Sequence, residues 1–581
     1  MRRISLRRPG VPSRLAACLT AAGVVAALLT TSGGATASPK PSQLTTKVTA
    51  NDGVTYTATN HMLPAAKGPG REWLLTWAGS ADPTKPDFLA VVDATRDSPT
   101  YGDVVNTVTL GPGLSNEAHH MQYVWHKGDR LYAGALLQDT VFVFDTKALP
   151  ALKLAGVNST VDTPCGTAPD AFQVLRDGTA YATYLGGPDV PGPCTFTNGE
   201  VREGNGAAGS PGEIVRMDKN GKTLAEIPAA LAEGEDPEQC GNVPALKKAT
   251  CANPHGIMVN EERDIMVASD FVEARHFLSP KVPDQANLAR QTVRVWDISN
   301  RQNPKLLSVS KMPDGPRAER EKSAIWHESR VVMEPALPHK KKHKGAFASS
   351  MLGGAIFYAP DVSVPEPKWR EVFDDTTAYR AAGAPKDVTG AGDAGSWLMV
   401  SPDDRYLFHT VMGQSTAYGK PLDRTTGMLY VLDIQKLLAA GDDPRCDIDT
   451  LKEAYRGGGE RDCPALTSAM PIRDTTDGGP HWGAMDNFEQ TRGGTFRETE
   501  KISRLATSNY FIAGSFSGDG NHEVCMYDLD RKGKLRQDRS FRDERTGRPC
   551  VDFDRSSWPH GRTGPARPHG ILFTVSDSVL K

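Results

Sequence analysis

A short β-rich run that ends on an aspartate, or on a turn containing one, recurs along the chain and restricts the fold more than any other feature. Alternating β-branched and aromatic residues are typical of a strand, and aspartate is typical of the turn after it. Seven copies occur, at Phe88–Asp93, Val141–Asp145, Ile214–Asp218, Val293–Asp297, Ile356–Asp361, Leu429–Asp433 and Val524–Asp528. A unit that returns this often predicts a repeat architecture.

A second element precedes most copies and consists of a strand, a polar turn and another strand. Gly256–Val259 followed by Asn260–Val267 is one example, and Trp397–Val400 followed by Ser401–Phe408 is the clearest. Each unit therefore reads as four antiparallel strands. Seven such units are typical of a propeller, which leaves only short, protected sheet edges. We predict an all-β, seven-bladed β-propeller.

The two ends of the chain complement each other. Glu72–Trp77 supplies a partner for the first Asp-ending strand, but no inner strand precedes it. The last residues supply such a strand at Arg567–Val575. We predict that this C-terminal strand joins the N-terminal blade and closes the ring. The alternative, two unrelated β-domains, leaves the position of the terminal strand unexplained.

Residues 1–37 have the features of a cleaved signal peptide. Arginines precede an apolar stretch at Leu15–Leu29, and Ala35–Ala37 forms a small-residue cleavage site. We expect cleavage after Ala37, which leaves residues 38–581 as a single propeller domain in a secreted or cell-envelope (periplasmic) protein. The apolar stretch is interrupted and too short for a stable membrane anchor. Export by either the Sec or the Tat route is compatible with this segment.

The cysteines agree with export. Removal of the signal segment with Cys18 leaves eight, an even number that favours disulfides in an exported chain. They fall into four sequence-local couples, each closing a short polar or Gly/Pro-rich segment. We expect the pairs Cys165–Cys194, Cys240–Cys251, Cys446–Cys463 and Cys525–Cys550 as disulfide-stapled loop insertions. A thiolate metal site is the competing interpretation, but no C-x-x-C spacing occurs.

The charge distribution argues against nucleic acid as a partner. The formal net charge is −3, and no basic stripe follows any segment. No sequence feature specifies an oligomeric state.

Histidines stand where several inner strands begin. In a propeller these strands line the central axis, so side chains that enter them converge. Three entries share a Pro-His pair, at His255, His481 and His569, and a fourth contains His119 and His120. Other entries offer Asp170, Glu328 and Asp393, which could orient imidazole N–H groups. Imidazoles from separate blades suit copper, iron or zinc, so we predict an axial metal site, with either His119 or His120 as a ligand.

With these residues in view, the chain resembles the selenium-binding protein family, which includes the bacterial methanethiol oxidases. Lys85–Asp93 followed by Ser98–Tyr101 is similar to the family's KPD-[YF]-L-x-x-[VI]-D and SP-x-Y segment. Glu117-Ala-His119-His120 is similar to the family's E-L-H-H, and the resemblance continues through Ser401–Phe408, Gly478–Pro480 and Pro568-His569. These motifs stand in the family's order and span nearly the whole mature chain.

The resemblance implies a seven-bladed propeller with histidine-bound copper. It also implies oxidation of a small thiol such as methanethiol by O₂ and water to an aldehyde, H₂S and H₂O₂. Glu117 or Asp170 would be the catalytic proton acceptor. Two alternatives remain at this stage: a four-histidine non-haem iron oxygenase, and a non-catalytic exported propeller that binds a metal or a partner. Propellers serve many functions, so the fold alone cannot choose between these three.

Overall fold

The computed structural model describes most of the chain after the N-terminal segment. The described residues are 42–64, 71–113, 118–237, 240, 247–274, 290–316, 331–351, 354–375, 377–378, 395–412, 427–456, 460–472, 479–510 and 520–581. All lie within one compact unit, Pro41–Lys581. The predicted signal peptide and the residues Glu117, Glu328 and Asp393 lie outside the described residues. Within the described part, no helix is long and apolar enough to cross a membrane.

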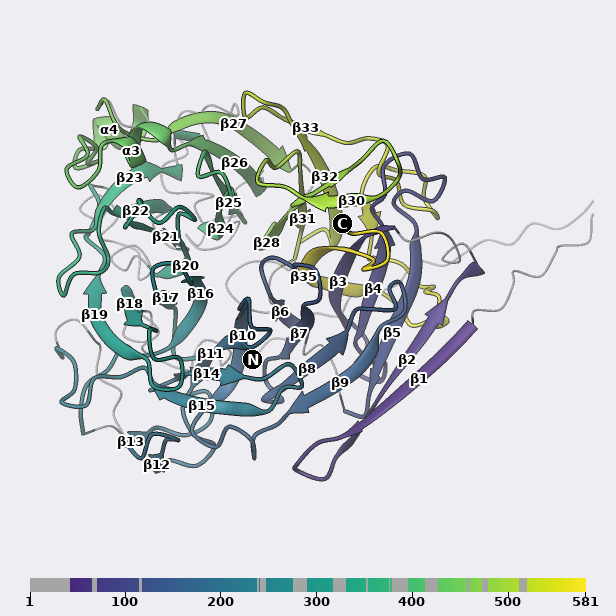
Figure 1. Ribbon diagram of the computed structural model, residues 1–581, viewed down its shortest axis with the longest axis horizontal. Coiled ribbons are helices and arrows are strands. Elements are labelled where there is room, and N and C mark those ends of the chain that lie inside the picture. Colours follow the sequence, from purple (N-terminus) through teal and green to yellow (C-terminus); the bar gives the residue numbers. More distant parts are fainter. Residues whose placement is uncertain are drawn as a thin grey trace, which may run out of the picture. The chain divides into compact units, whose positions relative to one another are not determined.

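Seven antiparallel sheets form a seven-bladed β-propeller, as predicted (Figure 1). Each blade is given with its strands in spatial order. Blade 1 contains β1 (Ser42–Thr49), β2 (Thr55–Met62), β5 (Val104–Gly111), β4 (Phe88–Asp93), β3 (Glu72–Ser80) and β35 (Ala566–Val575). Blade 2 contains β6 (Ala118–Met121), β7 (Arg130–Ala135), β8 (Thr140–Asp145) and β9 (Lys153–Asn158). Blade 3 contains β10 (Thr167–Val174), β11 (Ala180–Gly186), β14 (Glu213–Met217) and β15 (Thr223–Pro228).

The other four blades follow the same plan. Blade 4 contains β16 (Pro254–Asn260), β17 (Ile265–Asp270), β18 (Thr292–Asp297) and β19 (Lys305–Lys311). Blade 5 contains β20 (Val332–Ala336), β21 (Ala346–Ser350), β22 (Ala355–Ala359) and β23 (Arg370–Asp374). Blade 6 contains β24 (Gly395–Val400), β25 (Tyr406–Val411), β26 (Gly427–Asp433) and β27 (Ala465–Ile472). Blade 7 contains β28 (Trp482–Met485), β31 (Arg504–Ser508), β32 (Glu523–Leu529) and β33 (Leu535–Gln537), with β34 (Val551–Asp552) also paired to β32.

A few elements lie outside the blades. The hairpins are β12 (Gly192–Thr195) with β13 (Val201–Gly204), and β29 (Phe488–Gln490) with β30 (Phe496–Glu498). The described helices are the short α3 (Gln435–Ala439) and α4 (Leu451–Arg456). The four disulfides Cys165–Cys194, Cys240–Cys251, Cys446–Cys463 and Cys525–Cys550 are present, and they are the sequence-local pairs expected above. Disulfides of this number are typical of an oxidising, extracellular environment.

The repeated aspartate has a structural cause. The seven predicted runs correspond to the third strand of each blade counted outward from the innermost strand, from β4 to β32. In six of them the carboxylate accepts a hydrogen bond from the backbone N–H two residues later, at 2.8–3.1 Å. Such an Asx turn satisfies a backbone donor as the chain leaves the strand. The aspartate thus ends the third strand and begins the turn toward the fourth.

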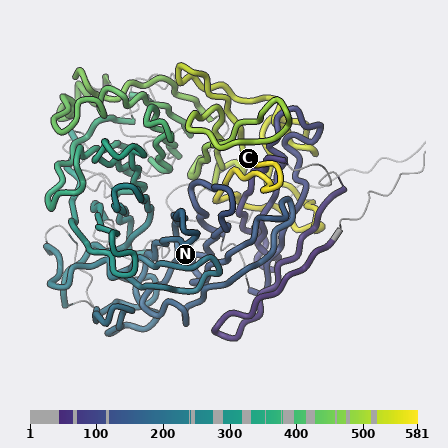
Figure 2. The backbone as a smooth tube through the Cα atoms, viewed as in Figure 1, coloured from purple at the N-terminus to yellow at the C-terminus, as the bar shows by residue number. Residues whose placement is uncertain are grey.

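The C-terminal strand closes the ring as predicted. β35 pairs antiparallel with β3 along its length, from Ala566 opposite Ser80 to Val575 opposite Glu72. Figure 2 shows the yellow C-terminal segment beside the dark blue strands that follow the N-terminal hairpin. The indole N–H of Trp73 donates to Ser576 Oγ at 3.0 Å and fixes the end of the closure. The sequence did not predict that β1 and β2 extend blade 1 beyond the usual four strands.

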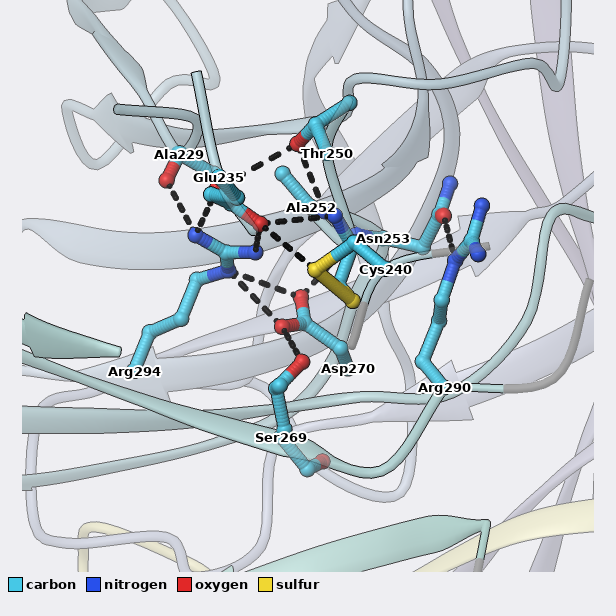
Figure 3. Close-up of polar contacts among 12 residues, drawn as sticks. Ala229, Glu235, Cys240, Thr250, Ala252, Asn253, Ser269, Asp270, Arg290 and Arg294 are labelled. Carbon is cyan, nitrogen blue, oxygen red and sulfur yellow. Dashed lines mark hydrogen bonds and ion pairs between the residues drawn. A yellow bond between two sulfur atoms is a disulfide. The ribbon is translucent and has the colours of Figure 1, made fainter. Parts of the chain in front are cut away.

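Buried arginines join strands within and between blades. Arg294 of β18 lies 2.8 Å from both Asp270 of β17 and Glu235, which follows blade 3 (Figure 3). It also donates to the carbonyl oxygen of Ala229 at 2.8 Å. The backbone N–H of Asn253 donates to Asp270 at 2.9 Å, so this network also fixes the entry to β16. A buried charge is tolerated only when it is paired and hydrogen-bonded in this way.

We expect Arg294→Met to lower the free energy of unfolding by about 3–5 kcal/mol, because it leaves buried carboxylates without their partner. Arg301→Met is the control. Arg301 is partly exposed and pairs with Glu261 at 2.7 Å, and loss of such a pair costs about 1 kcal/mol or less. Urea unfolding followed by tryptophan fluorescence measures both. Equal losses in the two variants would contradict the role given to the Arg294 network.

Candidate metal centre

The inner strands share an irregularity at the point where they meet the axis. The pairing register shifts between Ala118 and Met121, Pro169 and Phe172, Pro254 and Ile257, Val332 and Pro335, and Gly395 and Leu398, and opposite β35 between Trp77 and Ala78. Such bulges occur beside active sites because they redirect a side chain out of the regular alternation. The polar residues at these shifts are His119 and His120, Asp170, His255, Glu334, Ser396 and His569. Blade 7 adds His481, which directly precedes β28.

All seven blades therefore contribute a polar side chain at the same level, and all of these side chains are buried. His119 is the most accessible at 4% exposure, and Asp170, His120 and Ser396 are at 0%. Two overlapping groups have ligand atoms within 4.8 Å of one another. The first is His119, His120, Asp170 and His255, and the second is His120, His481 and His569.

Asp170 lies at the centre of the first group. Its carboxylate is 2.9 Å from His119 Nε2, 2.7 Å from His120 Nδ1 and 3.3 Å from His255 Nε2. Burial alone would raise the pKa of Asp170, but the three imidazoles outweigh burial and hold this pKa well below its usual range. Asp170 is therefore a carboxylate whose charge is shared among three rings.

His255 has an acidic neighbour at each ring nitrogen. Its Nδ1 donates to the backbone oxygen of Met333 at 2.9 Å and lies 3.3 Å from Glu334 Oε1. Burial opposes protonation, but Asp170 and Glu334 together raise the pKa of His255 to about 9. Both ring nitrogens of His255 thus have an acidic oxygen within 3.3 Å, and His255 also belongs to the first group of possible ligands.

His120 and His481 are arranged differently. The Ser396 hydroxyl donates to the backbone oxygen of His481 at 2.5 Å, so its oxygen accepts from His481 Nδ1 at 2.9 Å. His120 Nδ1 faces Asp170. If Nδ1 of each neutral ring carries the hydrogen, the lone pair of each ring lies on Nε2. These two Nε2 atoms are 2.8 Å apart.

At this distance the two Nε2 atoms can either share one hydrogen, carried by one of the rings, or bind one cation. Burial lowers the pKa of His120 to about 3, against the opposing charge of Asp170, and burial with the neighbouring imidazoles lowers the pKa of His481 well below its usual value. A protonated, positively charged ring in this pair is therefore disfavoured. His569 Nε2 is buried and has no hydrogen-bond partner among the described residues, and its ring lies 4.9–5.0 Å from the other two. Bonds of about 2 Å from three imidazole nitrogens to one metal ion are compatible with these distances between the rings.

The structure brings the five predicted histidines and Asp170 together at the axis. Glu117 lies outside the described residues. Sequence reasoning missed Glu334 and Ser396, because it located the entries of blades 5 and 6 at Glu328 and Asp393. Neither missed residue belongs to a Pro-His pair, the signal that identified His255, His481 and His569. An alignment of the inner strands of all seven blades could have found both residues, because Glu334 and Ser396 stand at the same register shift as the axial histidines.

Comparisons with known proteins support the fold. No family model and no curated protein matches the chain. A solved structure titled a hypothetical selenium-binding protein from Sulfolobus tokodaii is similar, with 14% identity and a TM-score of 0.53 over 88% of this chain and 95% of that one. The periplasmic gluconolactonase of Pseudomonas aeruginosa matches at 10% identity, TM-score 0.44, over 87% and 99% of the two chains. Virginiamycin B lyase from Staphylococcus aureus matches at 10% identity, TM-score 0.34, over 73% and 84%. At such identities the likeness to the selenium-binding protein shows a shared propeller fold.

The glycine after His255 is required by the site. A Cβ atom at Gly256 would lie 2.2 Å from Glu334 Oε2 and 2.7 Å from Pro335 Cδ. We expect Gly256→Ala to lower the free energy of unfolding by about 1–3 kcal/mol through overpacking. Gly493→Ala is the control, because its nearest non-neighbouring atom is Thr491 Oγ1 at 3.9 Å, and such a change should be neutral or slightly stabilising. Equal unfolding curves for the two variants would show that the Glu334 side chain can move away from the new methyl group without a loss of stability.

Proposed function

We propose that this chain is an exported, metal-dependent oxidase of small thiols, in which His120, His481 and His569 hold the metal. Copper is the metal we favour. The observation that carries the proposal is the pair of buried Nε2 atoms of His120 and His481, which lie 2.8 Å apart beside His569 Nε2, an atom with no hydrogen-bond partner among the described residues. Three neutral imidazoles are a donor set that suits copper and also binds iron and zinc.

His119 and His255 take a different role in this proposal, although sequence reasoning offered them as ligands. Both direct Nε2 at Asp170. They therefore hold the carboxylate that orients His120. A carboxylate that receives the other nitrogen of a ligand imidazole fixes the ring and raises its basicity. We assign Asp170 to this positioning role instead of proton acceptance, because its charge is already shared among three rings.

The thiol substrate is proposed from the sequence resemblance to the methanethiol oxidases, and the similar fold supports membership in the selenium-binding protein family. The reaction would be CH₃SH + O₂ + H₂O → HCHO + H₂S + H₂O₂. A bound copper ion would supply a Lewis acid that favours the thiolate and a carrier of electrons to O₂. The burial of every axial side chain restricts the site to small molecules and keeps bulk water from the imidazoles.

Export is part of the proposal. The four disulfides fit an oxidising compartment, and the signal peptide with cleavage after Ala37 supplies the route. A cleaved, secreted chain would begin at Ser38, which N-terminal sequencing of the protein recovered outside the cytoplasm would detect.

Metal content tests the site. We expect about one copper per chain, with nitrogen couplings in the EPR spectrum, because three imidazoles are in place. His481→Ala and His569→Ala should each lose the metal while the fold is kept. His409→Gln is the matched control, a buried histidine that contacts Asp375 instead of the axial group. Iron in place of copper would favour the oxygenase alternative. No metal after reconstitution would leave the non-catalytic alternative and refute the centre.

Activity tests the substrate. With methanethiol and O₂, the copper-loaded protein should form formaldehyde, H₂S and H₂O₂ in equal amounts. His569→Ala should abolish this turnover, and His409→Gln should keep it. Measurement of O₂ uptake and of all three products distinguishes this reaction from simple thiol-to-disulfide oxidation, which forms no formaldehyde. A copper-loaded protein that forms only the disulfide would contradict the proposed reaction.

A further inference from the structure

Two aromatic side chains continue the axial cluster away from its imidazoles. The indole ring of Trp482 stacks on His120, with centroids 4.2 Å apart and planes inclined by 30°. The phenol ring of Tyr123 stacks in turn on Trp482, with ring centroids 4.9 Å apart and planes inclined by 29°. All three side chains are at most 1% exposed. They form a continuous, dry π-stack from a proposed metal ligand to a tyrosine.

The Tyr123 hydroxyl has a base in place. It donates to Glu334 Oε2 at 2.6 Å, and its oxygen accepts from the backbone N–H of Ile257 at 3.3 Å. The other oxygen of Glu334 lies 3.3 Å from His255 Nδ1. A phenol that loses an electron becomes a strong acid, and a carboxylate at hydrogen-bond distance can take its proton without movement of either ring. The Ile257 N–H then remains as a donor to the phenoxyl oxygen.

We propose that Tyr123 is a redox-active residue that stores one oxidising equivalent for the axial centre. In the forward step one electron leaves the phenol through Trp482 toward His120, and the phenol proton passes to Glu334 Oε2. The products are a neutral phenoxyl radical, a neutral carboxylic acid and a one-electron-reduced oxidant. The electron acceptor would be a one-electron oxidant formed from O₂ at the histidine cluster. The redox role of Tyr123 therefore rests on the proposed function. The reverse step returns the electron and the proton to Tyr123.

Another buried tyrosine shows what the arrangement adds. Tyr132 is also fully buried and also stacks on an aromatic ring, that of Phe172 at 6.1 Å. Its hydroxyl donates to the backbone oxygen of Asp218 at 3.0 Å. A backbone carbonyl is not a base that can keep a proton, so among the described residues the hydrogen-bond acceptors of the Tyr132 hydroxyl cannot take its proton. Tyr132 is therefore the matched control for Tyr123.

The experiment uses the full mature chain after metal removal. A photo-oxidised ruthenium tris-bipyridine complex removes one electron, and the sample is frozen and examined by EPR, with ring-deuterated tyrosine to identify the radical. We expect a long-lived tyrosyl signal in the parent protein and in Tyr132→Phe, and loss of most of it in Tyr123→Phe. Glu334→Gln should shorten the lifetime of the signal, because an amide cannot keep the proton. Phenylalanine fits the same stack, and circular dichroism checks that each variant is folded.

The outcomes separate this inference from the metal proposal. Metal content is measured on parallel samples that have not been stripped. A Tyr123-dependent radical in a chain that binds no metal would support the redox-active tyrosine and refute the proposed function. Bound copper with equal radical signals in Tyr123→Phe and Tyr132→Phe would overturn the assignment of Tyr123 and leave the metal centre standing. An unchanged lifetime in Glu334→Gln would refute the proton acceptor.

Discussion

The buried carboxylate of Asp170 is the constraint on which the axis depends. It lies within 3.3 Å of nitrogens from His119, His120 and His255, so it ties together the inner strands of blades 2, 3 and 4. In a low-dielectric interior an anion is stable only with partners of this kind. Because Asp170 takes Nδ1 of His120, it also decides that Nε2 of that ring faces His481 and His569. The second group of imidazoles is thus a consequence of the first.

The bulges explain how seven blades deliver side chains to one level. A regular strand would alternate its side chains between the two faces of the blade, so none would point along the radius of the ring. The register shifts at the inner strands break this alternation where His119, Asp170, His255, Glu334 and Ser396 stand. Each shift brings neighbouring backbones into close approach. This crowding favours glycine at two positions. A Cβ atom at Gly256 would clash with Glu334, and a Cβ atom at Gly570 would lie 3.0 Å from the backbone nitrogen of Met121.

Local sequence signals predicted the features that are encoded locally. The Asx turns made the third strands visible, and the missing inner strand of blade 1 identified β35 as its replacement. The Pro-His entries identified three of the axial histidines. Glu334 and Ser396 escaped because a bulge inserts residues into the register and carries no sequence signature of its own. The stack of His120, Trp482 and Tyr123 joins residues of blades 2 and 7 that are far apart in the sequence, and only the closed ring creates it. The β1–β2 extension was missed because it repeats no element of the other blades.

The buried acidic side chains and the neutral imidazoles of the propeller axis come from different blades. Blades 3 and 5 supply the carboxylates Asp170 and Glu334, and these flank His255, whose pKa is raised to about 9. Blades 7 and 1 supply His481 and His569, whose pKa values are held well below the usual range by burial and by the neighbouring imidazoles. A cation bound by neutral imidazoles alone would be costly to bury. His120 belongs to both groups, so in the proposed centre Asp170 would stand one imidazole away from the cation and would offset its charge without occupying a ligand position. This separation would let the site hold a metal through nitrogen donors while the compensating charge stays in the adjacent blades.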